Sequence, residues 1–330
     1  MTIRDVAARA GVSPATVSRV FSQPDAVASA TRSKVLAVAE ELRYVPNPVA
    51  RSLARRRTGN LGIVVPDIAN SFSAMIVKAV QQEARRAGFA LFVAASDEFA
   101  DDEERWAQAL APQVDGLLLV SPLQSDAGLR DLADLVPVVV TNRVLDGVPV
   151  VLTQVAEATG HAVEHLHALG HRRVVYLAGP DGYSNDDRVA GLRAACARIG
   201  LEPVVLGPFP ARFSSGVRAA DLVLAAGATA VVAFNDDIAA GLLNRFADRG
   251  VRVPADVSVV GHDDTALAEM VTPRLTTVRI PAAAAGAAAA RMLVENIGAN
   301  DGTARRYELS GELIVRASTG PAPADATSSP

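Results

Sequence analysis

The sequence is poor in cysteine and has no long apolar run, and each absence excludes a class of protein. Its 330 residues include one cysteine, Cys196, which excludes an internal disulfide and a cysteine cluster for zinc. Hydrophobic residues make up 50% of the chain, yet no uninterrupted apolar stretch reaches the ~18 residues that a membrane-spanning helix needs. The alanine tract at 282–290 is too short and too weakly apolar to replace one. We therefore expect neither a disulfide scaffold nor a membrane protein.

Two signatures of other protein classes are also missing. The N-terminal stretch MTIRDVAARAG has charges where a signal peptide has its apolar segment, so we expect a cytoplasmic protein rather than an exported one. The phosphate-binding pattern G-x-x-x-x-G-K-[ST] is absent, which counts against a P-loop kinase. We expect no metal, no cofactor and no catalytic residues.

Positive charge is concentrated at the N-terminus. Residues 1–57 contain ten Arg or Lys against four Asp or Glu, a net charge of +6. Because the whole chain carries −4, the remaining residues carry −10. A basic surface attracts a polyanion and an acidic one repels it. The split predicts a small basic head that contacts nucleic acid and an acidic body that does not.

The first 45 residues have the pattern of a helix-turn-helix domain. Apolar residues recur at helical spacing over 3–43, and Gly11 and an SQPD turn separate three short helices. Ser13 is placed to cap the second helix. Pro14 then occupies the first helical position, where its missing N–H costs nothing.

The second of these helices has the geometry of a recognition helix. Val17 and Val20 turn inward, which leaves the opposite face free to enter a major groove. Arg19 is the best base reader on that face because its guanidinium can bind guanine O6 and N7 together, whereas Thr16 and Ser18 suit phosphates. The predicted DNA contacts of the head are Thr2, Pro14, Ala15, Thr16, Ser18 and Arg19. The pattern alone leaves open a three-helix bundle that binds protein, with Arg19 merely solvated.

From residue 61 to about 320 the pattern becomes that of an α/β protein. Short β-branched runs alternate with helix-length stretches: LGIVVP, FALFVAAS, DGLLLVSP, VPVVVTN, RRVVYLAG, ATAVVAFND and DVSVVGHDD. Strands at this rhythm predict parallel sheets built from βαβ units. The pattern restarts near 142–155, which predicts two similar lobes, and we expect the chain to cross back near 265–280. The tail at 321–330 has the composition of a disordered end.

Seven long stretches occur in a consistent order: TIRDVAARAGVSPATVSRVF, TRSKVLAVAEELRYVPNPVARSLARRRT, LGIVVPDIANSF, LGHRRVVYLAGP, FNDDIAAG, VPADVSVVGHDD and TPRLTTVRIP. Together they resemble the lactose/galactose repressor family of bacterial transcription regulators, from about residue 2 to about 319. The resemblance implies a homodimer or tetramer that binds pseudo-palindromic operator DNA. It also implies a core like that of periplasmic sugar-binding proteins, with a small-molecule effector.

Residues 46–60, PNPVARSLARRRTGN, combine four arginines with a lone leucine, Leu53. Asn47 can cap and Pro48 can start a helix of about two turns, which is marginal in water because nucleation is unfavourable below ~12 residues. The resemblance implies that this hinge helix pairs with its dimer mate in the minor groove, where residue 53 wedges between base pairs. The implied DNA contacts of the hinge are Asn47, Ala50, Arg51, Leu53 and Arg55. The alternative is that Leu53 packs on the core beside an ordinary basic linker.

Polar residues follow several expected strands, where ligands bind in open α/β sheets. Asp67, Asn142, Asn235 and Asp263 have such positions, although each also suits a helix cap. The effector-binding residues that the resemblance implies are Ser71, Phe72, Asn142, Arg188, Asn235 and Asp263, with Phe213 as a stacking wall. Arg, Asn and Asp together suit the donors and acceptors of a sugar or polyol, and a purine or other metabolite stays open. The family pattern is broken at Ser71, Ser73 and Thr153–Gln154, which weakens the inference of a stacked base.

The stretch HAVEH, His161 to His165, fits the H-x-x-E-H spacing of inverted zinc peptidases. In the resembled family this segment is a structural helix, which we expect here over 155–169, and no convincing third ligand is evident. We therefore expect no zinc site. The acidic pairs at 236–237 and 263–264 diverge in direction, so one member of each is better interpreted as a helix cap than as part of an acid–base pair.

The sequence thus predicts a helix-turn-helix head over 1–45, a hinge over 46–60 and a two-lobed α/β core over 61–320. We expect a transcription regulator, a repressor whose operator affinity is controlled by a small-molecule effector such as a sugar or polyol. Two other functions stay open: a two-lobed α/β sugar-processing enzyme with an accessory basic head, and a free sugar-binding protein for transport. Turnover of candidate sugars separates the enzyme from the sensor.

Overall fold

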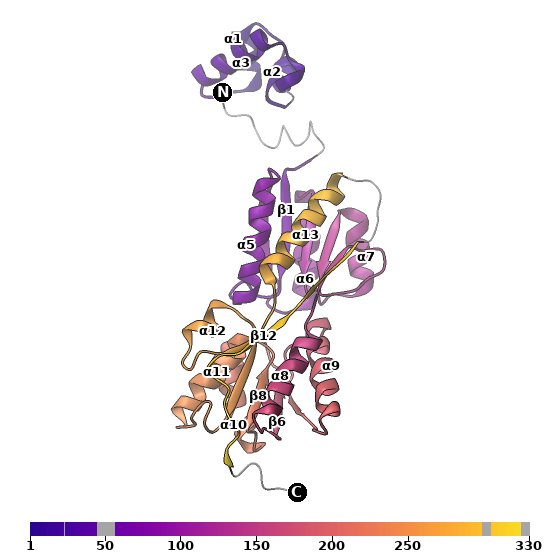
Figure 1. Ribbon diagram of the computed structural model, residues 1–330. Coiled ribbons are helices and arrows are strands. Elements are labelled where there is room, and N and C mark those ends of the chain that lie inside the picture. The colour runs from indigo at the N-terminus through magenta and orange to yellow at the C-terminus, as the bar shows by residue number, and fades with distance from the viewer. Residues whose placement is uncertain (23, 45–56, 299–304, 325–330) are drawn as a thin grey trace. The chain divides into compact units, whose positions relative to one another are not determined.

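The computed structural model describes residues 1–22, 24–44, 57–298 and 305–324 (Figure 1). The chain divides into two compact units, the head Met1–Gly59 and the core Asn60–Pro330. The hinge contacts predicted from the sequence lie outside the described residues: Asn47, Ala50, Arg51, Leu53 and Arg55. Within the described ranges, no helix is long and apolar enough to cross a membrane.

The head is a bundle of three helices, α1 (Ile3–Ala10), α2 (Pro14–Ser22) and α3 (Ser29–Glu41), with a 3-10 turn η1 at Pro24–Ala26. Its small core consists of valine and alanine side chains: Val6, Ala7, Ala10, Val17, Val20, Val35 and Ala39. The helix-turn-helix architecture is confirmed, and the inward-facing valines of the second helix are buried as predicted.

Local capping explains where the head's first two helices begin and end. The Thr2 backbone N–H donates to Asp5 Oδ2 at 2.7 Å, so the first turn of α1 is held by a carboxylate. Gly11 ends this helix with a φ of 65°, a left-handed conformation that glycine adopts without strain. At the start of α2, Ser13 Oγ accepts the backbone N–H of Thr16 at 3.1 Å, which is the predicted cap.

Lobe 1 of the core is a six-stranded parallel sheet in the order β11-β5-β4-β3-β1-β2. Its strands are β1 (Asn60–Val65), β2 (Ala90–Ala95), β3 (Gly116–Val120), β4 (Val138–Thr141), β5 (Val150–Gln154) and β11 (Arg306–Ser310). Its helices are α5 (Ser71–Arg86), α6 (Ala100–Leu110), the 3-10 turn η2 (Ala111–Gln113), α7 (Asp126–Leu135) and α13 (Ala282–Gly298). Leu118 of β3 packs with α5 and α13, whereas its neighbours Leu117 and Leu119 pack with α6 and α7, so helices cover both faces.

Lobe 2 has a second six-stranded sheet in the order β12-β10-β9-β8-β6-β7. Its strands are β6 (Val174–Leu177), β7 (Val204–Leu206), β8 (Ala230–Ala233), β9 (Ser258–Asp263), β10 (Thr276–Arg279) and β12 (Glu312–Ile314). Its helices are α8 (Ala156–Ala168), α9 (Tyr183–Arg198), α10 (Phe213–Ala225), α11 (Asp236–Asp248) and the short α12 (Ala266–Met270). The pair α8 and α9 packs on one face and the pair α10 and α11 on the other.

The two sheets share one topology. When the strands of each lobe are numbered in chain order, their spatial order is 6-5-4-3-1-2 in both lobes. The order reverses between the first and third strands, and the carboxyl ends of strands around such a reversal form a ligand crevice. The outermost strands differ, because β11 runs parallel to β5 whereas β12 runs antiparallel to β10.

Within the described residues the chain passes between the lobes three times: after β5, after β10, and between β11 and β12 (Figure 1). The first passage lies at the C-terminal end of the 142–155 window, because β5 still pairs with β4. The third had no counterpart in the sequence pattern. It occurs at Gly311, where a Cβ would lie 3.0 Å from the Arg279 carbonyl and 3.1 Å from Val155. The three passages therefore lie against one another, and a glycine permits that approach.

Candidate functional site

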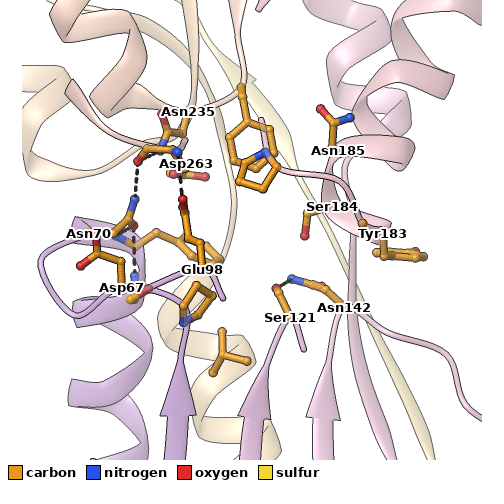
Figure 2. A pocket seen from close by; sticks show the side chains of 18 of the residues that line it. Asp67, Asn70, Glu98, Ser121, Asn142, Tyr183, Ser184, Asn185, Asn235 and Asp263 are labelled. Atoms are coloured by element: carbon orange, nitrogen blue, oxygen red, sulfur yellow. Dashed lines mark hydrogen bonds between the residues drawn. The ribbon is translucent and has the colours of Figure 1, made fainter. Parts of the chain in front are cut away.

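A cleft lies between the lobes of the core, at the carboxyl ends of their strands (Figure 2). Its empty volume is about 950 Å³, counted to include space that is open to solvent. Lobe 1 lines it with Pro66 after β1, Ser121 after β3 and Asn142 after β4. Lobe 2 lines it with Asn235 after β8 and Asp263 at the end of β9. Both sheets therefore contribute polar groups to one ligand-sized space.

Two opposite charges are buried together in the cleft: Arg188 on α9 and Asp263 on β9, each 4% exposed. Arg188 Nη2 lies 3.4 Å from Asp263 Oδ1, and its Nη1 donates to the Ser184 carbonyl at 2.6 Å. The guanidinium carbon lies 4.4 Å from the centroid of the Phe234 ring. Arg188 Nε, in contrast, is a buried donor without a hydrogen-bond partner in the described part of the chain. Such a donor costs about 1–3 kcal/mol, so an acceptor on a bound ligand would relieve it.

Burial shifts the pKa values of Asp263 and of its neighbour His262. Burial raises the pKa of Asp263 well above its usual value, and the positive charge of Arg188 opposes that rise. Burial, helped by Arg188, lowers the pKa of the neighbouring His262 to about 3, so its imidazole is neutral. His262 Nδ1 lies 2.8 Å from the Ala233 carbonyl, which only accepts, so Nδ1 donates there and Nε2 accepts from the Thr159 hydroxyl at 3.0 Å.

Asn235 is held by its own local hydrogen bonds. Its Oδ1 accepts the Ile238 backbone N–H at 2.9 Å, which caps α11, and its Nδ2 donates to the Ala211 carbonyl at 3.1 Å. The next residue, Asp236, is buried and accepts from Thr277 Oγ1 at 2.7 Å. Burial raises the pKa of Asp236 to about 7. Asp236 supports the loop behind the cleft rather than lining it.

Two neutral lobe 1 residues of the cleft, Ser121 and Asn142, are built on an unusual backbone. Ser121 and Asn142 end β3 and β4 with φ values of 48° and 52°, in the left-handed region that non-glycine residues seldom adopt. Asn142 Oδ1 accepts the Thr153 backbone N–H at 2.9 Å, and its Nδ2 donates to Ser121 Oγ at 3.3 Å. These hydrogen bonds fix the amide and offset the cost of the strained backbone.

Polar contacts join the lobes on one side of the cleft (Figure 2). Asn70 Nδ2 of lobe 1 donates to the Ala211 carbonyl of lobe 2 at 3.3 Å, and the Ala211 N–H donates to Glu98 Oε1 at 3.3 Å. Arg212 Nε lies 3.3 Å from Asp67 Oδ2. Each contact needs both lobes in place, so a ligand that alters the angle between the lobes alters these contacts.

Burial also changes the pKa of Asp237, whose carboxyl group lies where the two lobes meet. Asn70 Nδ2 also lies 3.4 Å from Asp237 Oδ2. Burial, and secondarily the negative charge of Asp67, raises the pKa of Asp237 to about 6. Burial likewise raises the pKa of Glu98. Acidic groups therefore crowd the side of the cleft where the lobes meet.

The cleft contains five of the effector residues expected from the resemblance: Phe72, Asn142, Arg188, Asn235 and Asp263. Ser71 is the first residue of α5 and does not line the cavity. Phe213 does not line it either, and its ring is 44% exposed. The Phe213 carbonyl lies against Gly241 of α11, so the first turn of α10 packs closely on that helix. The aromatic residues that line the cavity are Phe72, Tyr183 and Phe234.

The sequence did not predict several residues that line the cleft: Asn70, Glu98, Tyr183, Ser184, Asn185 and Phe234. Asn185 is 8% exposed, and its Oδ1 accepts from Gly179 N at 3.1 Å and from the Tyr176 hydroxyl at 3.3 Å. A usable signal existed for Asn70, which adjoins Ser71, and for Phe234, which follows β8 and adjoins Asn235. Each lies directly after a strand or beside an expected ligand, where the carboxyl-end rule applies.

The DNA-contact candidates of the head lie on its surface. Pro14, Ala15 and Arg19 are exposed, and Thr16 and Ser18 are partly exposed, all on α2. Arg19 forms no ion pair with a described residue, whereas Arg9 pairs with Glu41 at 2.7 Å and Arg32 with Asp25 at 3.4 Å. The sixth candidate, Thr2, is exposed at the N-terminus of α1. One face of α2 therefore presents a free guanidinium beside hydroxyl groups.

The HAVEH stretch lies on α8, but its side chains bind different partners. His161 lies 3.9 Å from Glu157, His165 Nε2 hydrogen bonds Thr319 Oγ1 at 2.9 Å, and Glu164 pairs with Arg198. Throughout the ranges that the structure describes, no group of three or more His, Cys, Asp or Glu residues could hold a metal ion.

Comparison with known proteins gives a consistent set of relatives. Residues 2–47 match the model of "Bacterial regulatory proteins, lacI family", and residues 163–319 match that of "Periplasmic binding protein-like domain". The HTH-type transcriptional regulator DegA of Bacillus subtilis (strain 168) is 32% identical over 97% of this chain and 98% of DegA.

Two solved structures are similar over nearly the whole chain. The lac repressor dimer bound to operator and the anti-inducer ONPF has a TM-score of 0.85 and 31% identity, over 97% of this chain and 99% of that one. The complex of transcriptional regulator CelR with cellobiose has a TM-score of 0.70 and 35% identity, over 96% and 99%. All three relatives are regulators, and the two structures hold DNA or a sugar-like ligand.

Proposed function

The chain belongs to the lacI family of bacterial regulatory proteins, and we propose that it is a sequence-specific repressor whose affinity for operator DNA is set by a neutral sugar or polyol in the cleft. The observation that carries the effector half of this proposal is Arg188, which lines a ligand-sized cavity and whose Nε is a buried donor without a partner among the described residues. Native proteins seldom leave such a group unsatisfied unless a ligand or water meets it.

The charge of the cleft favours a neutral ligand. Among the side chains that line it, Asp67, Glu98, Asp181 and Asp263 are acidic, and Arg188 is basic. A sugar phosphate or a carboxylate would be repelled by this excess of acidic groups. A hydroxyl group, in contrast, donates to carboxylates and accepts from a guanidinium or an amide. Several hydroxyls on one small ring use all of these partners.

We assign the DNA contacts to the head and the hinge. In the head these are Thr2, Pro14, Ala15, Thr16, Ser18 and Arg19, with Arg19 reading guanine. In the hinge they are Asn47, Ala50, Arg51, Leu53 and Arg55, with Leu53 as the minor-groove wedge. Two copies of this head on a homodimer match a pseudo-palindromic operator, because symmetric dimers bind two half-sites.

The two halves of the function are coupled through the angle between the lobes. A ligand held by lobe 2 at Arg188 and Asp263 and by lobe 1 at Asn142 spans both lobes. Ligand binding then favours one lobe angle, and in a dimer that angle sets the separation of the two hinge segments. Coupling of this kind is reciprocal, and it typically changes affinity by about 5- to 150-fold.

The test needs an operator and an effector. DNA fragments that the purified protein selects from a random pool supply the operator. A panel of neutral monosaccharides, disaccharides and polyols supplies the effector, scored by the rise in unfolding temperature that a ligand of the native state causes. Wild-type protein should then change its operator affinity by about 5- to 150-fold when the effector is added.

Asp263→Asn should bind the selected DNA as wild type does and lose the response to effector, because the amide keeps the volume but not the charge that faces Arg188. Asp126→Asn is the matched control: its carboxylate is 53% exposed, outside the cleft, and this variant should respond normally. A full response in Asp263→Asn would place the effector site elsewhere. A protein that selects no DNA sequence would contradict the repressor itself.

A further inference from the structure

Another hollow adjoins the cleft. Its empty volume is about 660 Å³, counted with space open to solvent. Three loops line it: residues 97–99 after β2, residues 180–181 after β6, and residues 208–212 before α10. Glu98, Pro180 and Asp181 line both spaces, so the hollow continues the cleft outward rather than forming a separate site.

The hollow has apolar ring surfaces. Phe99 is 63% exposed at the start of α6, and Phe209 faces the same space from the loop after β7. Three prolines complete the apolar lining: Pro180, Pro208 and Pro210. An exposed phenylalanine beside proline rings leaves apolar area in water that a flat ring would cover.

The hollow is also acidic. Asp97, Glu98 and Asp181 bring three carboxylates to it, and the one basic side chain in its lining, Arg212, lies 3.3 Å from Asp67. A phosphate or carboxylate is disfavoured here for the same reason as in the cleft. Hydroxyl donors suit carboxylates, and the C–H face of a pyranose suits an aromatic ring, so the lining matches a sugar ring on both counts.

The backbone that presents Phe99 is strained and firmly held. Asp97 and Glu98 both have left-handed φ values, 51° and 68°, which are costly for residues with a Cβ. The Glu98 N–H donates to the Pro66 carbonyl at 3.1 Å, and the Phe99 N–H donates to the Ser96 carbonyl at 3.0 Å. The backbone that carries Phe99 is therefore held in place before any ligand arrives, which favours binding because the loop loses little entropy.

We propose that this hollow is an outer subsite for a second hexose ring, so that the effector is a neutral disaccharide or larger saccharide rather than a single sugar. The inner ring lies in the cleft beside Arg188 and Asp263. The second ring lies on Phe99 and Phe209, with its hydroxyls toward Asp97 and Asp181. The inference rests on the proposed function, because it takes the cleft to be a sugar site.

The test measures binding of paired ligands by isothermal titration calorimetry on the full chain. Each pair is a neutral disaccharide and the methyl glycoside of its inner ring, such as cellobiose with methyl glucoside, maltose with methyl glucoside, and lactose with methyl galactoside or methyl glucoside. At least one disaccharide should bind more than about 10-fold tighter than its matched methyl glycoside, because its second ring covers apolar area of Phe99 and Phe209.

Substitutions of Phe99 test whether the tighter binding of the disaccharide comes from the hollow. Phe99→Ala should reduce the affinity for the disaccharide by about 5- to 10-fold and leave the affinity for the methyl glycoside unchanged. Phe99→Trp should keep the wild-type affinity for the disaccharide, because it keeps an aromatic ring at this position. Phe92→Ala is the matched control, because Phe92 is 38% exposed on β2 and lines neither space. Phe209→Ala is less suitable alone, since Phe209 also packs on the lobe 2 core.

Each outcome decides between the two proposals. A methyl glycoside that binds as tightly as every disaccharide, with Phe99→Ala unchanged, overturns the outer subsite and leaves the sugar-binding repressor intact. Failure of every neutral saccharide to bind the wild-type protein overturns both. A disaccharide advantage that Phe92→Ala reduces as much as Phe99→Ala also overturns the subsite, because the loss is then not local to the hollow.

Discussion

The two lobes of the core have the same strand order, but they bury different kinds of side chain at the cleft. Lobe 1 ends its central strands in Ser121 and Asn142, which are neutral. In lobe 2, Asn235 lies two residues after the corresponding strand β8, and Asp263 is the last residue of β9, with its carboxylate buried against Arg188. The shared topology brings polar groups of both lobes to one cleft, whereas the buried pair of opposite charges, Arg188 and Asp263, comes from lobe 2 alone.

The lobes also differ in how closely their helices pack. In lobe 2 a Cβ at Gly216 of α10 would lie 1.9 Å from the Ile238 carbonyl, and one at Gly241 of α11 would lie 2.0 Å from the Phe213 carbonyl. In lobe 1 a Cβ at Gly286 of α13 would lie 2.8 Å from the Ile76 carbonyl. Helices α10 and α11 therefore approach each other more closely than α5 and α13, and backbone atoms cannot rotate aside as side chains do.

The largest expected effect comes from filling that close approach. Gly216→Ala should destabilise lobe 2 by more than about 4 kcal/mol, because the methyl group forces two helices apart, whereas Gly286→Ala should cost about 1–3 kcal/mol in lobe 1. Urea unfolding followed by circular dichroism measures both. Trp106 is the sole tryptophan and lies on α6 of lobe 1, so its fluorescence reports lobe 1 alone. Equal losses in the two variants would show that the helix separation does not limit packing.

The next effect contrasts a buried charge with a buried amide. Asp263→Ala should cost about 3–5 kcal/mol without ligand, because Arg188 stays buried and unpaired. Asn142→Ala should cost about 1–3 kcal/mol, since it leaves the Thr153 N–H without its acceptor. Denaturant titration of both variants at one pH gives the comparison. If the Asp263 loss is no larger than the Asn142 loss, water reaches Arg188 and the pair is not truly desolvated.

A smaller effect concerns pH. The pKa of Asp237 is raised to about 6 by burial, from a usual value near 3.8. The folded state therefore binds this proton more tightly than the unfolded state, and the associated stability is present below about pH 4 and lost as pH rises through about 6. Because the side chain is only partly buried, the loss should be about 1–2 kcal/mol.

Asp237→Asn should remove this part of the pH dependence and raise the stability at pH 7 relative to wild type. Thermal unfolding at pH 4, 5, 6 and 7 measures the difference between the two proteins. Asp134→Asn, an exposed carboxyl of lobe 1, should leave the pH profile unchanged. A difference that grows toward low pH instead would mean that the Asp237 carboxylate is favoured in the folded state.

Much of this architecture was readable from residue spacing. The seven β-branched runs quoted above each overlap an observed strand, and the caps at Gly11 and Ser13 lie where their backbone chemistry requires them. Local rules suffice for such features, because a turn or a cap depends on residues within one helical turn. The runs for β5, β7, β10, β11 and β12 carried too weak a pattern. These strands are short or lie where the chain passes between lobes, and partners distant in sequence hold them in place.

Some residues of the cleft could be predicted from the sequence, and others could be found only from the tertiary structure. Position after a strand was enough to identify Asn142, Asn235 and Asp263, because parallel strands all end at one edge. Spacing could not show that Phe234 lines the cleft and Phe213 does not, since that depends on how α10 packs on α11. Nor could it bring Phe99 beside Phe209, which are 110 residues apart on different lobes. The sequence by itself determined which groups stand at the strand ends, and only the packing of one lobe on the other decided which of them share a site, because distance along the chain carries no information about such contacts.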